Sequence, residues 1–166
     1  MAKAVFEERQ RFNQWWIWLI ILGIFAYEVY LLTDLVQEET LNSKTLSSYL
    51  LIMLPILIVL LVFLFSSLYT RIDESGIQTV FKPFGFKKKS FSWRAIETVE
   101  TITYSPLKDF GGWGYRLSFS GKGTAYNVKG NQGISIQLKN GKKFLIGTQK
   151  SEQALEVIES FSPSKK

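Results

Sequence analysis

A charge-free stretch of twenty residues, Tyr49 to Leu68, constrains this chain most strongly. At about 1.5 Å of rise per residue, a helix of this length matches a hydrocarbon core of roughly 30 Å. A second apolar stretch, Trp15 to Leu32, precedes it. We therefore expect two membrane-spanning helices, over residues 15–36 and 47–69, joined by a short extracytoplasmic loop over residues 37–46.

The charges around the two apolar stretches predict the orientation of the chain. Residues 70–166 hold sixteen Lys and Arg against eight Asp and Glu, whereas residues 33–48 hold three acidic side chains and one Lys. Because an excess of Lys and Arg marks the cytoplasmic flanks of a span, only the acidic loop is expected to lie outside. We therefore expect a multi-pass protein of the cytoplasmic (inner) cell membrane, with the N- and C-termini in the cytoplasm.

Residues 1–14 are polar and charged, with Phe6 and Phe12 placed between the charges. This composition predicts a solvated cytoplasmic N-terminal tail, and a short helix lying in the membrane interface is the alternative. Three Trp residues follow within residues 15–18, where an aromatic belt at the cytoplasmic interface is expected.

Glu28 is the one ionisable residue within the first apolar stretch. Carboxylates inside a membrane are candidates for proton or ion binding. Glu28 lies near the outer end of the stretch, shortly before Asp34, where its side chain can reach the interface. The sequence leaves open both an interfacial carboxylate and an ion-binding role.

After residue 69 the pattern changes to short strands separated by turn residues. Residues 69–73 and 77–82 flank a tight turn, and apolar and polar residues then alternate over Phe91–Tyr104. Asn140 and Gly141 form the strongest hairpin signal in the chain. We expect about seven antiparallel strands, arranged as a β-sandwich or a partly open barrel.

The last part of the chain changes period again. Apolar residues fall on one face between Ser151 and Phe161, and Pro163 stops the pattern. This predicts one C-terminal helix that caps the strands. The expected fold is therefore a transmembrane helix hairpin followed by a cytoplasmic α+β domain over residues 70–161, with a C-terminal tail over residues 162–166.

The order of these elements resembles the bacterial pleckstrin-homology-like (PH-like) domains of small membrane proteins with two N-terminal spans. Two motifs carry the resemblance: Ser92–Val99, similar to an aromatic-then-Ile strand of that family, and Lys143–Ile158, similar to its last strand and capping helix. The resemblance implies a PH-like fold over residues 70–161. The turn over residues 74–76 lacks the basic residues that hold inositol phosphates in eukaryotic relatives, so phosphoinositide recognition is not implied.

A basic and aromatic segment, KPFGFKKKS at residues 82–90, is the first candidate binding surface. Aromatic rings can enter the apolar edge of a bilayer, and each ammonium near an anionic surface contributes on the order of 1 kcal/mol. One strand leading away from the bilayer and one of equal length returning would bring this segment to the surface. A solvated hairpin loop is the alternative. The predicted membrane-contact residues are Lys82, Phe84, Phe86, Lys87, Lys88 and Lys89.

A glycine-rich segment over residues 105–116 is the second candidate surface. Glycine allows positive φ angles, and aromatic rings on a long loop can bind a protein partner. In the alternative interpretation, Trp113 folds back and plugs one end of the sheet. The predicted partner loop consists of Phe110, Gly111, Gly112, Trp113 and Gly114.

The composition excludes several kinds of chemistry. The chain has no Cys and no His, so disulfides, thiol chemistry, imidazole bases and Cys/His zinc sites are impossible. The segment SGKGT at residues 120–124 does not fit a phosphate-binding loop, because Arg116 stands where that motif needs its first glycine. We expect no catalysis, cofactor, metal site or small-molecule substrate. Nucleic acid is not expected as a partner, because the lysines are scattered and no aromatic RNA-binding strand is visible.

Two functions from different classes agree with these features. The first is a membrane-anchored, non-catalytic binding or scaffold module, which presents its domain to a protein partner or to lipid headgroups at the cytoplasmic leaflet. A second copy of the chain is one such partner. The alternative is a structural subunit or assembly factor of a larger membrane protein complex.

Overall fold

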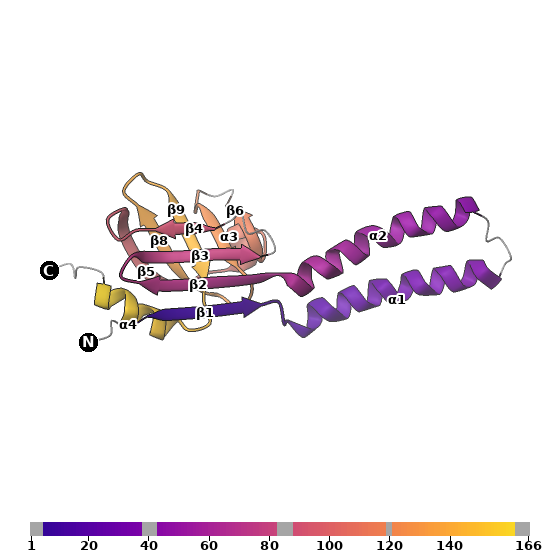
Figure 1. Cartoon of the computed structure of the whole chain (residues 1–166), viewed down its shortest axis with the longest axis horizontal. Coiled ribbons are helices and arrows are strands. Elements are labelled where there is room, and N and C mark those ends of the chain that lie inside the picture. Colours follow the sequence, from indigo (N-terminus) through magenta and orange to yellow (C-terminus); the bar gives the residue numbers. More distant parts are fainter. Residues whose placement is uncertain (1–4, 38–42, 83–87, 119–120, 162–166) are drawn as a thin grey trace. The chain divides into compact units, whose positions relative to one another are not determined.

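The computed structural model describes residues 5–37, 43–82, 88–118 and 121–161. The chain divides into two compact units, whose elements are labelled in Figure 1. One unit comprises Met1–Arg11 and Ser66–Lys166 and is called the β-domain. The other comprises Phe12–Phe65 and is called the helical segment. The helical segment is therefore an insertion between the first strand and the rest of the β-domain.

Two long helices form the helical segment, α1 over Trp15–Gln37 and α2 over Ser43–Phe65. Within the described residues, one helix is long and apolar enough to cross a membrane, over Trp15–Asp34, with a mean hydropathy of 1.8. This agrees with the first predicted span in length and composition. The apolar part of α2, Tyr49–Phe65, is shorter, so the second predicted span stays a prediction.

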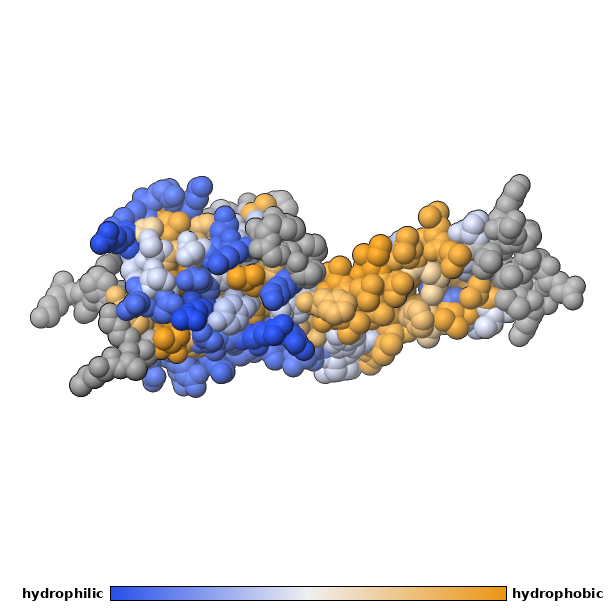
Figure 2. All heavy atoms as spheres, viewed as in Figure 1, coloured by the Kyte–Doolittle hydropathy of each residue, from blue (hydrophilic) through white to orange (hydrophobic). Residues whose placement is uncertain are grey.

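The two helices contact each other through apolar side chains. Phe12, which precedes α1, also contacts α2: its ring meets the ring of Phe63 edge to face, with the centroids 5.0 Å apart. Large apolar side chains such as Leu22 and Leu51 are exposed, and the helices are mainly orange in Figure 2. Exposed apolar surface of this extent is typical of a lipid or protein interface. A groove of about 180 Å³ between the helices is lined by Ile21, Ile24, Pro55, Ile56 and Val59.

Four antiparallel strands form sheet A, in the order β1-β2-β3-β4. The predicted turn between the second and third of these strands is confirmed, and it ends at Gly76 with a φ of +134°. A Cβ at this position would overlap the carbonyl oxygen of Phe91, so only glycine fits here. The strands are β1 (Phe6–Arg11), β2 (Ser67–Asp73), β3 (Gly76–Lys82) and β4 (Lys89–Phe91).

β1 corrects the prediction of a solvated tail over residues 1–14. Phe6, Glu8 and Gln10 are buried, whereas the residues between them are exposed. This alternation with period two is typical of a strand with one buried face. Two of the three buried positions are polar, so the hydrophobic pattern did not reveal the strand.

α2 also corrects the predicted helix over residues 47–69. The helix ends at Phe65, and the chain enters β2 at Ser67. Leu68 is fully buried in the β-domain and pairs across the sheet with residues of β1 and β3. An apolar run does not distinguish a leucine that faces lipid from one in a protein core, so the sequence placed the boundary too late.

Five strands form sheet B, in the order β5-β8-β9-β7-β6. All neighbours are antiparallel except β7 and β9, which are parallel, so the prediction of entirely antiparallel pairing is wrong at this pair. The β8–β9 hairpin fixes the direction of β9, and β7 pairs with the remaining edge of β9. The strands are β5 (Ile96–Thr103), β6 (Gly114–Leu117), β7 (Thr124–Asn127), β8 (Gln132–Leu138) and β9 (Lys143–Gly147).

The hairpin predicted at residues 140–141 is confirmed. Gly141 has a φ of +79°, and the backbone N–H of Leu138 donates to the carbonyl of Lys142 at 2.9 Å. The single strand predicted over Phe91–Tyr104 is wrong. The chain turns at residues 92–95 and divides into β4 and β5, which belong to different sheets.

The core of the β-domain lies between the two sheets. Phe91 of sheet A contacts Phe144 of sheet B, with ring centroids 4.8 Å apart. The predicted C-terminal helix is confirmed as α4 (Ser151–Phe161), and its buried residues include Ala154 and Ile158. Fully buried apolar residues of the two sheets include Leu68, Ile72, Ile77, Tyr126, Ile134, Ile136 and Ile146.

Candidate functional site

One end of sheet A carries a group of exposed basic side chains. The strand register places Arg11, Ser67 and Lys82 in one row across β1, β2 and β3, and Arg9 lies two residues away on β1. Among the described residues, no ion pair joins Arg9, Arg11 or Lys82 to a carboxylate. We call these three residues the basic cluster.

The basic cluster lies where the chain passes between the β-domain and the helical segment. Only residues 12–14 separate Arg11 from the start of α1, and only Ser66 separates the end of α2 from β2. Sequence reasoning selected Lys82 but missed Arg9 and Arg11, because it assigned both to a tail. The alternation of charges along residues 6–11 was the signal that could have placed them on a strand.

The predicted membrane-contact segment is described in part. Lys82 ends β3, Lys88 and Lys89 lie at the start of β4, and all three are exposed. Their exposure agrees both with the predicted membrane contact and with the alternative of a solvated hairpin loop, so the membrane contact stays a prediction. The other three predicted residues lie outside the described residues: Phe84, Phe86 and Lys87.

The predicted partner loop is bounded by regular secondary structure, and its residues 111–113 form bends. A short helix, α3 over Pro106–Phe110, ends at Gly111, whose φ is +69°. Phe110 is only 5% exposed and meets the ring of Tyr104 edge to face, with centroids 6.0 Å apart. This aromatic ring therefore belongs to the core, and it is unavailable to a partner.

The remaining residues of the predicted partner loop connect α3 to β6. Trp113 is half-buried, and its indole N–H donates to the carbonyl of Gly130 at 3.3 Å. The backbone N–H of Gly114 donates to the side-chain oxygen of Asn127 at 2.9 Å. Gly112 has a φ of +124°, which permits the sharp path between the helix and the strand. These contacts agree better with a packed connection than with an open aromatic loop.

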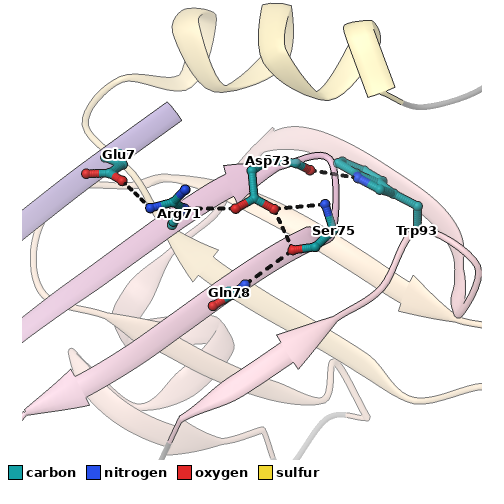
Figure 3. Close-up of polar contacts among 6 residues, drawn as sticks. All are labelled: Glu7, Arg71, Asp73, Ser75, Gln78 and Trp93. Atoms are coloured by element: carbon teal, nitrogen blue, oxygen red, sulfur yellow. Dashed lines mark hydrogen bonds and ion pairs between the residues drawn. The ribbon is translucent and has the colours of Figure 1, made fainter. Parts of the chain in front are cut away.

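A polar network closes the opposite end of sheet A, at the β2–β3 turn (Figure 3). The Asp73 carboxylate accepts hydrogen bonds from Arg71 Nε at 2.8 Å and from the Ser75 backbone N–H at 2.9 Å. Arg71 also pairs with Glu7 of β1 at 2.9 Å. The indole N–H of Trp93 donates to the carbonyl of Asp73 at 2.9 Å. Arg71 thus faces two carboxylates, so its charge is compensated within the domain.

The network shifts the pKa of Asp73, and the pKa of the nearby Tyr69 on β2 is shifted as well. Hydrogen bonds from Ser75 and Arg71 hold the pKa of Asp73 below its ordinary value of 3.8. Burial and the Glu7 carboxylate raise the pKa of Tyr69. An open groove of about 310 Å³ lies beside the network. The polar side chains of the network already bind one another, so they stabilise the turn. The groove is lined by Val5, Arg71, Asp73, Glu74, Ser75 and Phe161.

Buried hydrogen bonds connect β1 to the segment after β9. The Glu8 carboxylate accepts from the Thr148 hydroxyl at 2.6 Å and from the Gln149 backbone N–H at 2.9 Å. The Gln10 amide donates to the carbonyl of Gly147 at 2.7 Å. Because buried polar groups need such partners, these bonds explain why polar side chains occupy inward positions of β1.

The described residues give no support for a metal site. Within residues 5–37, 43–82, 88–118 and 121–161, no three His, Cys, Asp or Glu side chains are grouped so that they could hold a metal ion. The candidate site consists of the exposed basic side chains at one end of sheet A.

Comparison with known proteins identifies no relative. No protein-family model matches the chain, and neither a curated protein nor a solved structure matches it. The function is therefore inferred from the geometry of this chain alone.

Proposed function

We propose that this protein is a membrane-anchored, non-catalytic binding or scaffold module, in which a PH-like β-domain is held at the cytoplasmic leaflet by a two-pass helix hairpin. The observation that supports it most is the pairing of Arg11 with Ser67 in sheet A. These residues flank the whole helical segment. Paired residues of antiparallel strands have Cα atoms about 4.5–5.5 Å apart, so the helical segment must begin and end at nearly the same place.

This closed path restricts the membrane topology. If α1 crosses the bilayer, the chain has to cross again before Ser67, because Ser67 is hydrogen-bonded to the strand that precedes α1. A single crossing would place β1 and β2 on opposite sides of the membrane and would break sheet A. The pairing thus supports an even number of crossings.

The length of α2 is compatible with the second crossing. Its apolar part, Tyr49–Phe65, would span about 25 Å as a helix, a little less than a hydrocarbon core of roughly 30 Å. Local thinning of the bilayer accommodates a mismatch of this size at a modest cost. The whole of α2 has 23 residues, which adds further length at its start.

Charge supports the cytoplasmic location of the β-domain, and the fold supports the PH-like assignment. The basic cluster adjoins the points where the chain enters and leaves the helices, as expected for the cytoplasmic flank of a span. Two packed sheets followed by a C-terminal helix agree with a PH-like domain, whereas the parallel β7–β9 pair departs from that expectation. The proposed ligand is an anionic lipid headgroup or a protein partner.

Cysteine labelling tests the topology directly, because the chain contains no cysteine of its own. We expect a membrane-impermeant maleimide to label Glu39→Cys in intact cells and to label Gln153→Cys only after permeabilisation. Labelling of Gln153→Cys in intact cells would reverse the orientation and contradict the proposal. Labelling of both positions only after permeabilisation would show that the helices do not cross.

A structural subunit of a larger membrane complex is the second candidate, and one observation favours it. The apolar groove between α1 and α2 contains Pro55 and has room for a side chain of a neighbouring helix. Purification in mild detergent separates the two functions. The subunit is favoured if the full chain is recovered only within a large assembly and if Ile21→Trp or Val59→Trp disrupts that assembly. The module is favoured if the chain is recovered as a small unit that captures anionic lipid.

A further inference from the structure

An apolar and basic patch lies on α3 and β6. It overlaps the glycine-rich segment over residues 105–116, but it contains none of the residues 110–114 that were predicted as the partner loop. In the described β-domain, three large apolar side chains are mostly exposed: Val5 at 50%, Leu107 at 65% and Leu117 at 60%. Two of the three, Leu107 and Leu117, belong to this patch. Burying both would remove apolar area from water, so a surface that covers them would gain free energy.

The segments that carry the two leucines are connected although the leucines are ten positions apart in the sequence. The hydroxyl of Ser118 donates to the carbonyl of Asp109 at 3.1 Å, which joins the end of β6 to the end of α3. Lys122 pairs with Asp109 at 2.6 Å and closes the same region. The two segments that carry Leu107 and Leu117 are therefore joined by these contacts.

Cations are adjacent to these leucines in the sequence. Lys108 and Arg116 are each adjacent in sequence to one leucine, and both are exposed. Asp109 is the one acidic residue between residues 105 and 123, and it is already paired with Lys122. The patch therefore combines apolar side chains with a net positive charge, the composition that binds the interface of an anionic membrane. We define the leucine patch as Leu107, Lys108, Arg116, Leu117 and Lys122.

The position of the leucine patch within the β-domain fits this ligand. Figure 1 shows α3 and β6 toward the same end of the domain as the end of β1 and the start of β2. That end contains Arg11 and Ser67, from which the chain continues into the helices. Val5, the third exposed apolar residue, precedes β1 and lines the groove at the opposite end, beside Asp73.

We propose that the leucine patch docks the β-domain on the anionic inner leaflet, with Leu107 and Leu117 inserted among the headgroups and with Lys108 and Arg116 facing lipid phosphates. This inference rests on the proposed function, since it requires the helices to be in the membrane. It deepens that function by naming the ligand, anionic phospholipid, and the surface that binds it. Docking fixes one orientation of the β-domain on the leaflet.

The test uses the full chain in nanodiscs, with an environment-sensitive fluorophore on single cysteines. Leu107→Cys and Leu117→Cys report the leucine patch, Val5→Cys is the matched apolar control at the opposite end, and Leu22→Cys on α1 reports insertion of the helices. In discs of phosphatidylcholine with phosphatidylglycerol, we expect blue-shifted emission at positions 107, 117 and 22 and water-like emission at position 5. In discs of phosphatidylcholine alone, we expect the shift at 107 and 117 to weaken.

A charge variant sharpens the test. Lys108→Gln should lower the ratio of docked to undocked domain about fivefold, because each cation near an anionic surface contributes about that factor. Lys139→Gln, on the β8–β9 hairpin, removes the same charge and should change the ratio much less. Circular dichroism of each variant checks that the fold is retained.

The outcomes separate this inference from the function on which it rests. Water-like emission at positions 107 and 117 with blue-shifted emission at position 22 would overturn docking and leave the membrane anchor intact. Water-like emission at position 22 as well would overturn both. A blue shift at 107 and 117 that persists in detergent and grows with protein concentration would show that a second copy covers the leucines, which also overturns docking.

Discussion

The two ends of sheet A differ in whether their charged side chains form ion pairs within the described residues. At the β2–β3 turn, Arg71 is paired with both Glu7 and Asp73. At the other end, Arg9, Arg11 and Lys82 have no carboxylate partner among the described residues. The same strands, β1 and β2, contribute to both ends, so the difference lies in which charges the register brings together.

This difference separates structure from binding. A paired arginine forms its hydrogen bonds within its own domain and stabilises a turn. Clustered cations repel one another, so an external anion that binds them lowers their electrostatic energy. The paired end holds the chain together, and the basic end is available to a ligand. The apolar helices adjoin the basic end in the sequence, and for this reason we propose anionic lipid as its ligand.

Removing β1 has the largest expected effect, because this strand serves both ends. We expect residues 70–166 alone not to fold, since they lack Phe6, the Glu8 and Gln10 hydrogen bonds and the start of β2. A helix-free β-domain, with an Asn-Gly turn joining Arg11 directly to Ser67, should fold as a monomer, because these residues are already cross-strand partners. Circular dichroism and size-exclusion chromatography distinguish the two chains. If residues 70–166 unfolded cooperatively at the same urea midpoint as the helix-free β-domain, β1 would be dispensable.

Neutralising the basic cluster should have the next largest effect. In the helix-free β-domain, replacing Arg9, Arg11 and Lys82 together with Gln should weaken binding to vesicles containing phosphatidylglycerol about a hundredfold, at on the order of 1 kcal/mol per cation. The matched control replaces Lys139, Lys142 and Lys143 of the β8–β9 hairpin with Gln and should weaken binding far less. Vesicle sedimentation measures both. Equal losses in the two variants would mean that only net charge matters and that the basic end has no special role.

The smallest expected effect concerns the paired end and depends on pH. The pKa of Asp73 is lowered in the folded protein, so its contribution to stability is complete above the ordinary value of 3.8 and disappears as the pH falls through the lower folded-state pKa. At neutral pH, Asp73→Asn should reduce the free energy of unfolding by about 1 kcal/mol, because an uncharged amide accepts weaker hydrogen bonds.

Urea unfolding of the helix-free β-domain at several pH values checks this prediction. The difference between wild type and Asp73→Asn should shrink below about pH 4, where the wild-type carboxyl becomes protonated. Glu100→Gln, at an exposed position of β5, serves as the control and should show no such dependence. A difference that stays constant with pH would mean that the charge of Asp73 does not stabilise the turn.

Local patterns in the sequence predicted much of the β-domain. The β2–β3 turn at Gly76, the hairpin at Gly141 and the helix over Ser151–Phe161 all formed where the pattern placed them. Each depends on neighbouring residues: a glycine that tolerates positive φ, or apolar residues repeating with the period of a helix. The same holds for the apolar stretch of α1, whose length and composition suffice for a membrane span.

The candidate site could be predicted only in part, and the reason is its dependence on distant contacts. Lys82 was selected from composition, but Arg9 and Arg11 join it only because β1 pairs with β2 across the inserted helical segment. Phe110 was expected on a partner loop and is in the core, because Tyr104 packs against its ring. The sequence did not predict that Leu107 and Leu117 would be exposed, since isolated leucines do not reveal this.

The sequence by itself determined the apolar helices, the turns and the excess of positive charge after the second apolar stretch, because each of these follows from residues close together in the chain. The tertiary structure decided that residues 6–11 are a strand of the β-domain. That decision rests on contacts such as the hydrogen bond from Gln10 to Gly147, which joins residues 137 positions apart. Polar residues at inward positions are stable only once such partners are in place, so no local pattern predicted this strand.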